Sequence, residues 1–456
     1  MLFAKLLDPK WNLFWALFHI GMGIACVFTP WVLIIWFYII FGIHFLRGIR
    51  ELGKGRFFYF LSLMFYLISF ELLDRMAKTS PFIPYEVGKY FMLLTVLVSL
   101  LFYGKKNNLA IIMAFLLVPA LFYDLSGKRQ IFDFINNFFA PFAAAIGIAV
   151  FYKRKISEEQ MAGIFRMIWL TCLAALIYSF IKTPDFGEID FELNANFETT
   201  GGAASNQVST LFGMGMFLTF YAVINRLRFS GFLVTDILIL FAFAFQGLLS
   251  FSRGGMLIGL LCMLIYYFFV FSGGKSRLNP KSILVLLLVA VAGFAAFRVA
   301  DQITGGKLLL RYKGETKGTL LGAKDKTLDV ITSGRLSIFT EDIILWQRNP
   351  IFGVGVGSSS YLRFKTKRVA AHVEFSRLMS EHGTLGLFYF ILLLIVYFNL
   401  WKDPFFRPNR NLLLALFVMA FVTTFHAAMR TFVSPMFFIL AVLQITPVVG
   451  AKKQIK

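Results

Sequence analysis

The sequence predicts an all-α protein whose helices cross a membrane many times. The chain has 456 residues, of which 58% are hydrophobic and 57 are phenylalanine. A soluble domain has too little interior to bury that much apolar surface, and apolar runs of about 17–25 residues match a helix that crosses a bilayer. The runs are continuous rather than alternating, which excludes a transmembrane β-barrel. The fold class is therefore a polytopic bundle of transmembrane helices.

The apolar runs divide the chain into three regions. A bundle of about eleven spans is predicted over residues 1–299, a long loop over 300–382, and the C-terminal spans over 383–456. We predict about 12–14 spans in all. Their approximate limits are residues 11–28, 30–46, 57–74, 87–103, 109–124, 138–152, 161–181, 207–225, 232–250, 255–272, 281–299, 383–401, 411–428 and 433–450.

The charges in the short loops predict the orientation of the chain. The formal net charge is +21, which in a soluble protein would suggest a nucleic-acid partner. Here basic loops such as RGIRELGKGR at 47–56 alternate with loops poor in Lys and Arg, and the loop at 183–200 is acidic. Because Lys and Arg accumulate in cytoplasmic loops, both termini are expected in the cytoplasm and the acidic loop outside. The same alternation places residues 300–382 outside.

The long loop is basic although it is predicted to lie outside, so its charge needs its own explanation. An anionic partner and contact with lipid headgroups are two alternatives. The segment after Ser333-Gly334 predicts a helix that ends at Asn349-Pro350, with Leu336, Phe339, Ile343 and Trp346 as one apolar stripe. A second helix is predicted over about Val369–His382, with His372 on one face.

Metal chemistry is not expected from the sequence. Cys26, Cys172 and Cys262 all fall within apolar runs, which is typical of small core residues and indicates neither a disulfide nor a metal site. His372 and His382 lack the spacing of a zinc motif, and no Cys or carboxylate cluster completes a ligand set. Gly353, Gly355 and Gly357 favour a bend that lets the backbone approach another group closely.

Four motifs follow one another between about residues 200 and 400. They are Asn206 in GGAASNQVSTLF; Ser252-Arg253-Gly254 at the outer end of a span; Gly334-Arg335 followed by Trp346, Pro350 and GVGVG; and His372 followed by SEHGTLGLFYF, which contains Glu381, Gly383 and Gly386. In this order the chain resembles the O-antigen ligase and O-antigen polymerase superfamily of bacterial envelope glycosyltransferases. The resemblance implies a GT-C-like fold in the bacterial inner membrane, with a periplasmic catalytic loop at 300–382.

The resemblance also implies the substrates. In this family the donor is a glycan joined to polyprenyl pyrophosphate, usually undecaprenyl pyrophosphate, and the acceptor is a hydroxyl of a glycan or glycolipid. Arginine forks suit a diphosphate, so Arg253 and Arg335 are the candidates to hold it. His372 is the candidate base for the acceptor hydroxyl, with Glu374 and Glu381 as alternative partners. The substrate-binding candidates are Asn206, Arg363, Lys365, Lys367, Arg368, Glu381 and Arg430, with His426 one turn from Arg430. No cofactor, metal or nucleic acid is expected.

Several functions remain open at this point. The first is an inverting, metal-independent ligase that moves a finished glycan onto an outer acceptor such as a lipopolysaccharide core. The second is a polymerase that joins repeat units on the lipid carrier, and related proteins glycosylate protein hydroxyls. A transporter or lipid flippase belongs to a different class and predicts broken helices in corresponding halves of the chain. No internal repeat of that kind is visible in the sequence.

Overall fold

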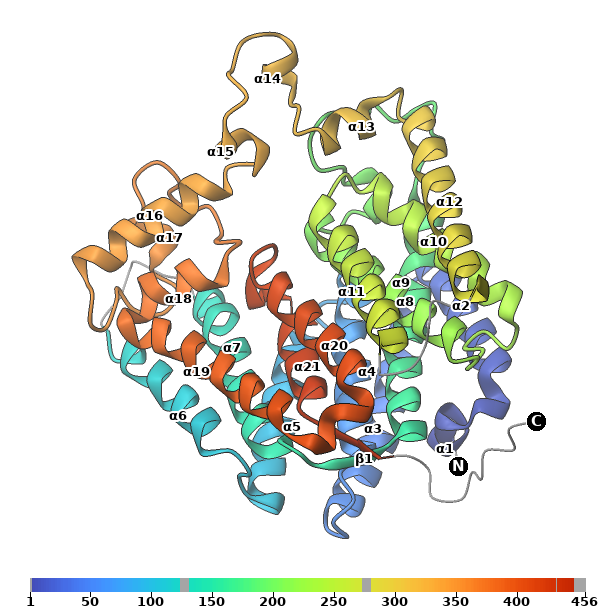
Figure 1. Cartoon of the computed structure of the whole chain (residues 1–456), viewed down its shortest axis with the longest axis vertical. Helices are drawn as coiled ribbons and strands as arrows, with labels where there is room; N and C mark the ends of the chain where they lie inside the picture. The colour runs from blue at the N-terminus through green and yellow to red at the C-terminus, as the bar shows by residue number, and fades with distance from the viewer. Residues whose placement is uncertain (1, 124–130, 273–279, 432, 447–456) are drawn as a thin grey trace.

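A computed structural model describes residues 2–123, 131–272, 280–431 and 433–446. These residues form a bundle of helices (Figure 1), which confirms the predicted all-α membrane fold. The helices of the bundle are α2 (Asn12–Phe28), α3 (Trp31–Leu52), α4 (Phe58–Met76), α5 (Val87–Tyr103), α6 (Asn108–Leu117), α7 (Ile131–Phe151), α8 (Glu158–Lys182), α9 (Ser205–Ile224), α10 (Leu233–Leu249), α11 (Arg253–Ser272), α12 (Pro280–Ile303), α19 (Thr384–Lys402), α20 (Arg410–Thr423) and α21 (Val433–Ala441). A helix lies at each predicted position.

Within the described residues, seven helices are long and apolar enough to cross a membrane. They cover Pro9–Phe28, Trp31–Leu52, Asp133–Phe151, Glu158–Lys182, Ser205–Ile224, Thr384–Lys402 and Pro404–Thr423. Four shorter apolar helices cover Val87–Tyr103, Asn108–Leu121, Leu233–Leu249 and Arg253–Phe268. The shorter segments are α1 (Leu2–Leu7) and the 3₁₀ turns η1 (Pro9–Trp11), η2 (Val118–Leu121), η3 (Glu198–Thr200), η4 (Pro404–Asn409) and η5 (Ala428–Arg430). Of these, η1, η2 and η4 belong to the apolar helices just named.

Helix α8 lies at the centre of the bundle, packed against α2, α4 and α9. Its side chains are buried on all sides from Ile164 to Leu176, as expected for a helix that is apolar all round. Some of its polar groups bond to neighbouring helices. The indole nitrogen of Trp169, for example, donates to the hydroxyl of Thr219 at 2.8 Å. The hydroxyl of Thr171 donates to Ser69 at 2.6 Å. Such bonds satisfy polar groups for which neither lipid nor the apolar core offers a hydrogen-bond partner.

The last predicted span, 433–450, is wrong for residues 442–446, and residues 447–450 lie outside the described residues. Helix α21 ends at Ala441, and β2 (Gln444–Thr446) then pairs in parallel with β1 (Lys155–Ser157), with Ile156 opposite Ile445. The amide of Gln444 also donates to the carbonyl of Arg154 at 2.8 Å. These tertiary bonds satisfy the backbone of the C-terminal segment in place of a further helical turn.

An arch of short helices leads from α12 across the upper end of the bundle, as drawn in Figure 1, to α16. The arch contains α13 (Lys307–Tyr312), α14 (Lys317–Leu320) and α15 (Leu328–Ile331), and it is followed by α16 (Arg335–Arg348), α17 (Ser359–Leu362) and α18 (Glu374–His382). The predicted helix after Gly334 is confirmed as α16, which ends at Arg348. Its buried residues are Ile338, Asp342 and Leu345 rather than the predicted stripe, because α16 packs on α18.

The second predicted helix of the loop begins five residues later than expected. Helix α18 starts at Glu374, and residues 369–373 carry no helix. The amide of Ala428 donates to the carbonyl of His372 at 3.0 Å, and the amide of Glu374 donates to the carbonyl of Thr424 at 2.8 Å. These long-range bonds hold the residues before Glu374 outside the helix. His372 therefore lies just before the N-terminus of α18.

Candidate active site

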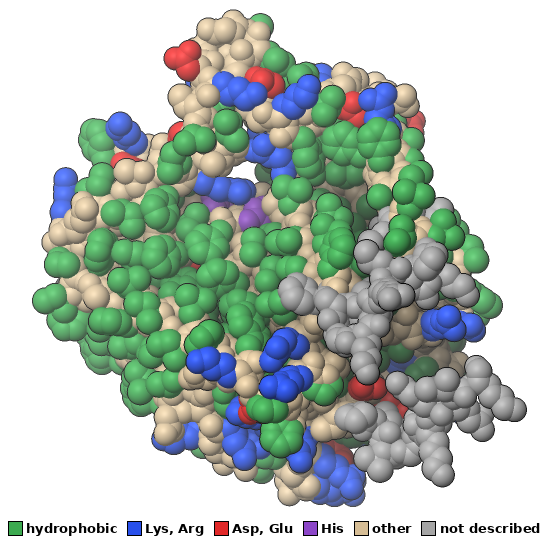
Figure 2. All heavy atoms as spheres, in the orientation of Figure 1, with side chains coloured by type: hydrophobic (Ala, Val, Ile, Leu, Met, Phe, Trp, Pro, Cys, Tyr) green, Lys and Arg blue, Asp and Glu red, His purple; other side chains and the backbone are tan. Residues whose placement is uncertain are grey.

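A cavity of about 720 Å³ lies beneath the arch. Figure 2 shows basic and histidine side chains gathered at this hollow. The lining residues come from the ends of bundle helices nearest the arch, from the arch itself and from the start of α16 and α18: Ala195, Asn206, Phe251, Ser252, Arg253, Gly254, Leu257, Arg311, Tyr312, Ile331, Thr332, Ser333, Arg335, Leu336, Phe339, His372, Val373 and Phe425. All three residues predicted to be catalytic and the predicted Asn206 line this one cavity.

Four helices begin at the cavity wall. Asn206 is the second residue of α9, Arg253 the first of α11 and Arg335 the first of α16, while Val373 is the N-cap of α18. A helix N-terminus carries about half a positive charge and leaves free backbone N–H groups. Four of them around one cavity make its wall attractive to an anion.

Three arginines add full positive charges to this wall. Arg253 donates from Nη1 to the carbonyl of Arg311 at 3.1 Å and from Nη2 to the carbonyl of Ile331 at 2.6 Å. Arg311 donates from Nη2 to the hydroxyl of Ser333 at 3.2 Å. Among the residues that the structure describes, neither these two nor Arg335 forms an ion pair with a carboxylate. The positive charge of the cluster is therefore uncompensated by the protein.

The repulsion within this arginine cluster shows in the pKa values of its members. Burial and, to a smaller extent, the nearby charges of Arg253 and Arg335 together lower the pKa of Arg311 to about 10. Burial and the charge of Arg253 also lower the pKa of Arg335. All three guanidinium groups still carry a proton at neutral pH. A bound anion would relieve this repulsion.

Asn206 is held in place by a chain of hydroxyl groups. The hydroxyl of Ser252 donates to Oδ1 of Asn206 at 2.9 Å, and the hydroxyl of Ser209 donates to that of Ser252 at 2.9 Å. The serine of the Ser-Arg-Gly motif thus links the starts of α9 and α11. This link orients the Asn206 amide beside Arg253.

His426 packs against the wall beside His372. Its side chain is only 5% exposed, and a Cβ atom on Gly254 would lie 2.2 Å from its Nδ1, so only glycine fits at position 254. Burial lowers the pKa of His426 to about 3, with contributions in the same direction from Arg335 and His372. His426 is therefore neutral at physiological pH, and these interactions show that it lies near both groups.

Two predicted substrate-binding residues are buried in ion pairs away from the cavity. Nε of Arg363 lies 2.8 Å from Oδ1 of Asp342. Oε2 of Glu381 lies 2.6 Å from Nη1 of Arg377. All four side chains are at most 1% exposed, and none of them lines the cavity. These residues join α16, α17 and α18, so their role in the structure is to fix the α16–α18 layer.

Three further predicted cations do not line the cavity either. Lys365, Lys367 and Arg368 are exposed on the segment after α17. That segment is held by Glu341, whose carboxylate accepts the amides of residues 364–366 at 2.7 to 3.1 Å. Lys365 lines a separate cavity of about 480 Å³ on α16. The side chain of Arg430 lies outside the residues that the structure describes.

The spaced glycines also contact protein rather than the cavity. A Cβ on Gly353, whose φ is +72°, would lie 2.4 Å from the carbonyl carbon of Glu381. The amides of Val354 and Gly355 donate to the carbonyls of Ser380 and Glu381 at 2.9 and 3.0 Å. The glycine run thus closes against the C-terminal turn of α18. The predicted close approach of the backbone occurs here, and none of the three glycines lines the cavity.

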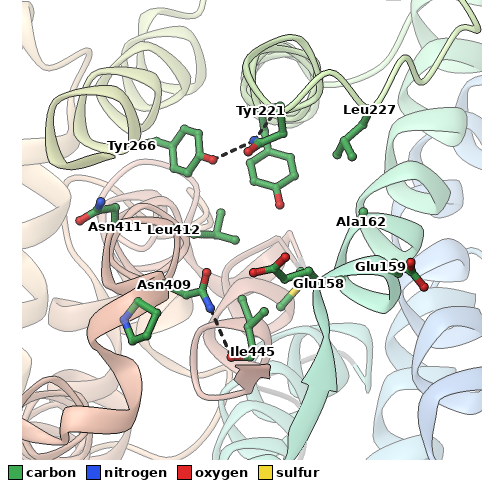
Figure 3. A pocket seen from close by; sticks show the side chains of 13 residues that line it. Glu158, Glu159, Ala162, Tyr221, Leu227, Tyr266, Asn409, Asn411, Leu412 and Ile445 are labelled. Carbon is green, nitrogen blue, oxygen red and sulfur yellow. Dashed lines mark hydrogen bonds between the residues drawn. The ribbon is translucent and has the colours of Figure 1, made fainter. Parts of the chain in front are cut away.

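A further cavity of about 350 Å³ lies at the opposite end of α9 and α11. Figure 3 shows Tyr221 and Tyr266 facing Glu158 and Asn409 across it. No Lys or Arg is among its lining residues, so a diphosphate would find no positive charge there. The arginine-lined cavity is the candidate active site.

Sequence reasoning missed Arg311 and gave His426 only a minor place. Arg311 follows the apolar run Leu308–Leu310, and that charge at the end of an apolar run was the only signal in the sequence. Its proximity to Arg253 and Arg335 comes from the path of the arch, which no local pattern encodes. His426 reaches the wall because the chain turns after Thr423, the last residue of α20.

Comparison with known proteins supports the resemblance seen in the motifs. The family model of the O-antigen ligase matches residues 237–391. This segment contains Arg253, Arg311, Arg335 and His372, while Asn206 precedes it. A search of curated proteins finds no match to the chain. Residues 237–391 are therefore similar to the O-antigen ligase family, and the apolar helices of the described residues are those of a multi-pass membrane protein.

Proposed function

We propose that the protein is an inverting glycosyltransferase of the ligase type. It transfers a glycan from undecaprenyl pyrophosphate to a hydroxyl on the periplasmic side, where a lipopolysaccharide core or a similar glycolipid is the acceptor. The observation that carries the proposal is the cavity in which Arg253, Arg311 and Arg335 lie beside His372. Its cations match a diphosphate, and its histidine matches a hydroxyl that must lose a proton.

In the proposed reaction the acceptor oxygen attacks the anomeric carbon from the face opposite the pyrophosphate. The bond from that carbon to the phosphate oxygen breaks, and its electron pair stays on the leaving diphosphate. The acceptor proton passes to the neutral imidazole of His372. The arginines and the helix N-termini stabilise the charge that grows on the diphosphate, and one such donor contributes about 3–4 kcal/mol. The guanidinium groups take the role that a metal ion has in other phosphate-leaving reactions.

The outward location of the cavity is the first premise that we can test. Native Cys26, Cys172 and Cys262 are buried, so a cysteine introduced at exposed Lys324 will be the only accessible thiol of the described residues. We expect Lys324→Cys to react with a membrane-impermeant maleimide in cells whose outer membrane has been permeabilised. Lys54→Cys, in the basic loop at 47–56, should react only after the inner membrane is opened. Labelling in the reverse order would overturn the proposal.

The reaction itself can be measured with purified protein in detergent. We expect transfer from an undecaprenyl-pyrophosphate-linked glycan to a lipopolysaccharide core, with release of undecaprenyl pyrophosphate. A ladder of repeat units on the lipid carrier, formed without the core acceptor, would instead identify a polymerase. Turnover without a sealed compartment is incompatible with a transporter. If the purified protein is folded and forms neither product, the glycosyltransferase assignment is refuted.

A further inference from the structure

The segment that carries His372 is bonded directly to the segment that carries His426. The amide of Glu374 donates to the carbonyl of Thr424 at 2.8 Å, and the amide of Ala428 donates to the carbonyl of His372 at 3.0 Å. The amide of Met429 donates to Oε2 of Glu374 at 3.0 Å. Residues 372–374 and 424–429 therefore meet in a short clamp, and Glu374 supplies a backbone and a side-chain contact to it.

A buried arginine holds the carboxylate of Glu374 in this position. Arg377 donates from Nε to Oε2 of Glu374 at 3.1 Å and from Nη2 to the other oxygen. It also pairs with Glu381 and donates to the carbonyl of Asn137 at 3.0 Å. The side chains of Glu374 and Arg377 are 0% and 1% exposed. Both oxygens of Glu374 thus have partners, and the carboxylate has a fixed direction.

Burial of such a charge network is a poor way to gain stability, since desolvation offsets most of the attraction between the ions. The network does fix the positions of residues 372–374 and 424–429 relative to each other. Its member Glu374 accepts the amide of Met429, which lies three residues after His426. Glu374 itself lies two residues after His372. Phe425, from the same clamped segment, lines the cavity together with His372. A shift of either segment would change where the imidazole of His372 stands relative to Arg335.

We propose that Glu374 is a positioning residue for His372. Its carboxylate locks residues 424–429 against residues 372–374 and so fixes the imidazole at the arginine-lined cavity. This inference rests on the proposed glycosyl transfer, because it assigns Glu374 a role in the geometry of that reaction. Glu374 does not line the cavity, so its effect passes through His372.

The matched control is Asp342, another buried carboxylate in the same layer. Asp342 is 0% exposed and pairs with Arg363, and its second oxygen accepts the hydroxyl of Ser376 at 2.9 Å. It contacts neither segment of the clamp by any hydrogen bond among the described residues. Glu374→Gln and Asp342→Asn each remove one buried negative charge beside an arginine. A purely structural role predicts the same consequences for both.

The test compares Glu374→Gln, Asp342→Asn and the unchanged protein in the purified transfer reaction. In the glutamine variant an NH₂ group faces a donor of Arg377 in either orientation, because Arg377 contacts both oxygens of Glu374. In one orientation the NH₂ group also faces the amide of Met429, so the clamp loosens. We expect kcat to fall about 10- to 100-fold, with the KM for the lipid-linked donor unchanged, because small displacements of a reacting group have effects of this size. Asp342→Asn should lower the melting temperature yet keep kcat within about twofold of the original.

Amide hydrogen exchange gives a second readout that does not need turnover. Exchange over residues 424–429 should rise in Glu374→Gln and stay unchanged in Asp342→Asn. Equal kcat losses in both variants, or an unchanged exchange pattern in Glu374→Gln, would overturn the positioning role. Failure of the unchanged protein to transfer glycan is a different result: it would refute the proposed function, and the role assigned to Glu374 in that reaction would fall with it.

Discussion

His372→Ala is expected to reduce glycan transfer about 10²- to 10⁴-fold, the range for loss of a general base. The imidazole lines the cavity in which three arginines lie, so an acceptor hydroxyl near it would also be near the diphosphate. Without the imidazole, the proton of the attacking hydroxyl has no neutral acceptor at that place. In cells the variant should accumulate lipid-linked glycan and lose surface glycan, while the amount of protein in the membrane is unchanged. Both glycan pools can be compared after extraction and gel separation.

Donor binding separates this role from a general collapse of the site. The arginine cluster is intact in His372→Ala, so a radiolabelled undecaprenyl-pyrophosphate-linked glycan should bind with its original affinity. Loss of that affinity would mean that His372 holds the donor instead of serving the acceptor. Normal surface glycan in the variant would remove His372 from the site altogether.

Arg335→Gln is expected to lower transfer about 10²- to 10³-fold, which corresponds to the loss of one charge-stabilising donor. Arg335 begins α16, where its guanidinium adds to the positive end of the helix. Its pKa is lowered by burial and by Arg253, so it already lies within a crowded cationic cluster. Removing it leaves less positive charge for the leaving diphosphate. The rate can be measured with purified protein at saturating donor.

The control lies on the same helix. Arg348 is the last residue of α16, is exposed, and does not line the cavity, so Arg348→Gln should transfer glycan at the original rate. Arg335→Lys keeps the charge but loses the two-pronged geometry of the guanidinium group, and it should fall between the original protein and Arg335→Gln. Equal activity of Arg335→Gln and Arg348→Gln would show that the charge of the cluster has no part in the reaction.

Much of the fold can be predicted from the sequence because bilayer-length apolar runs are a local signal. α8 and α9 lie where their runs predict them, and Gly334 and Asn349 bound α16 as their residue types suggest. The exceptions occur where a distant segment competes for the backbone. Residues 369–373 leave the predicted helix because the carbonyl of His372 bonds to Ala428 and the amide of Glu374 bonds to Thr424. Helix α21 ends early because β2 pairs with β1.

The residues of the candidate site also fall into two groups: those that a local motif predicts and those that depend on contacts between distant segments. Arg253, Arg335, His372 and Asn206 could be selected from motifs, because each lies in a short recognisable pattern. Whether a charged side chain faces a cavity or a buried partner depends on contacts across the chain. Arg363 looks like a loop cation, yet Asp342, far from it in sequence, takes its guanidinium. Arg311 has no motif, and only the course of the arch brings it to Arg253.

Arg253 uses two of the five N–H donors of its guanidinium group within the protein. Its Nη atoms donate to the carbonyls of Arg311 and Ile331, so the side chain joins the start of α11 to the arch. Its other N–H groups are not used by these two carbonyls. A substitution of Arg253 therefore removes a cation from the cavity and an attachment of the arch at the same time.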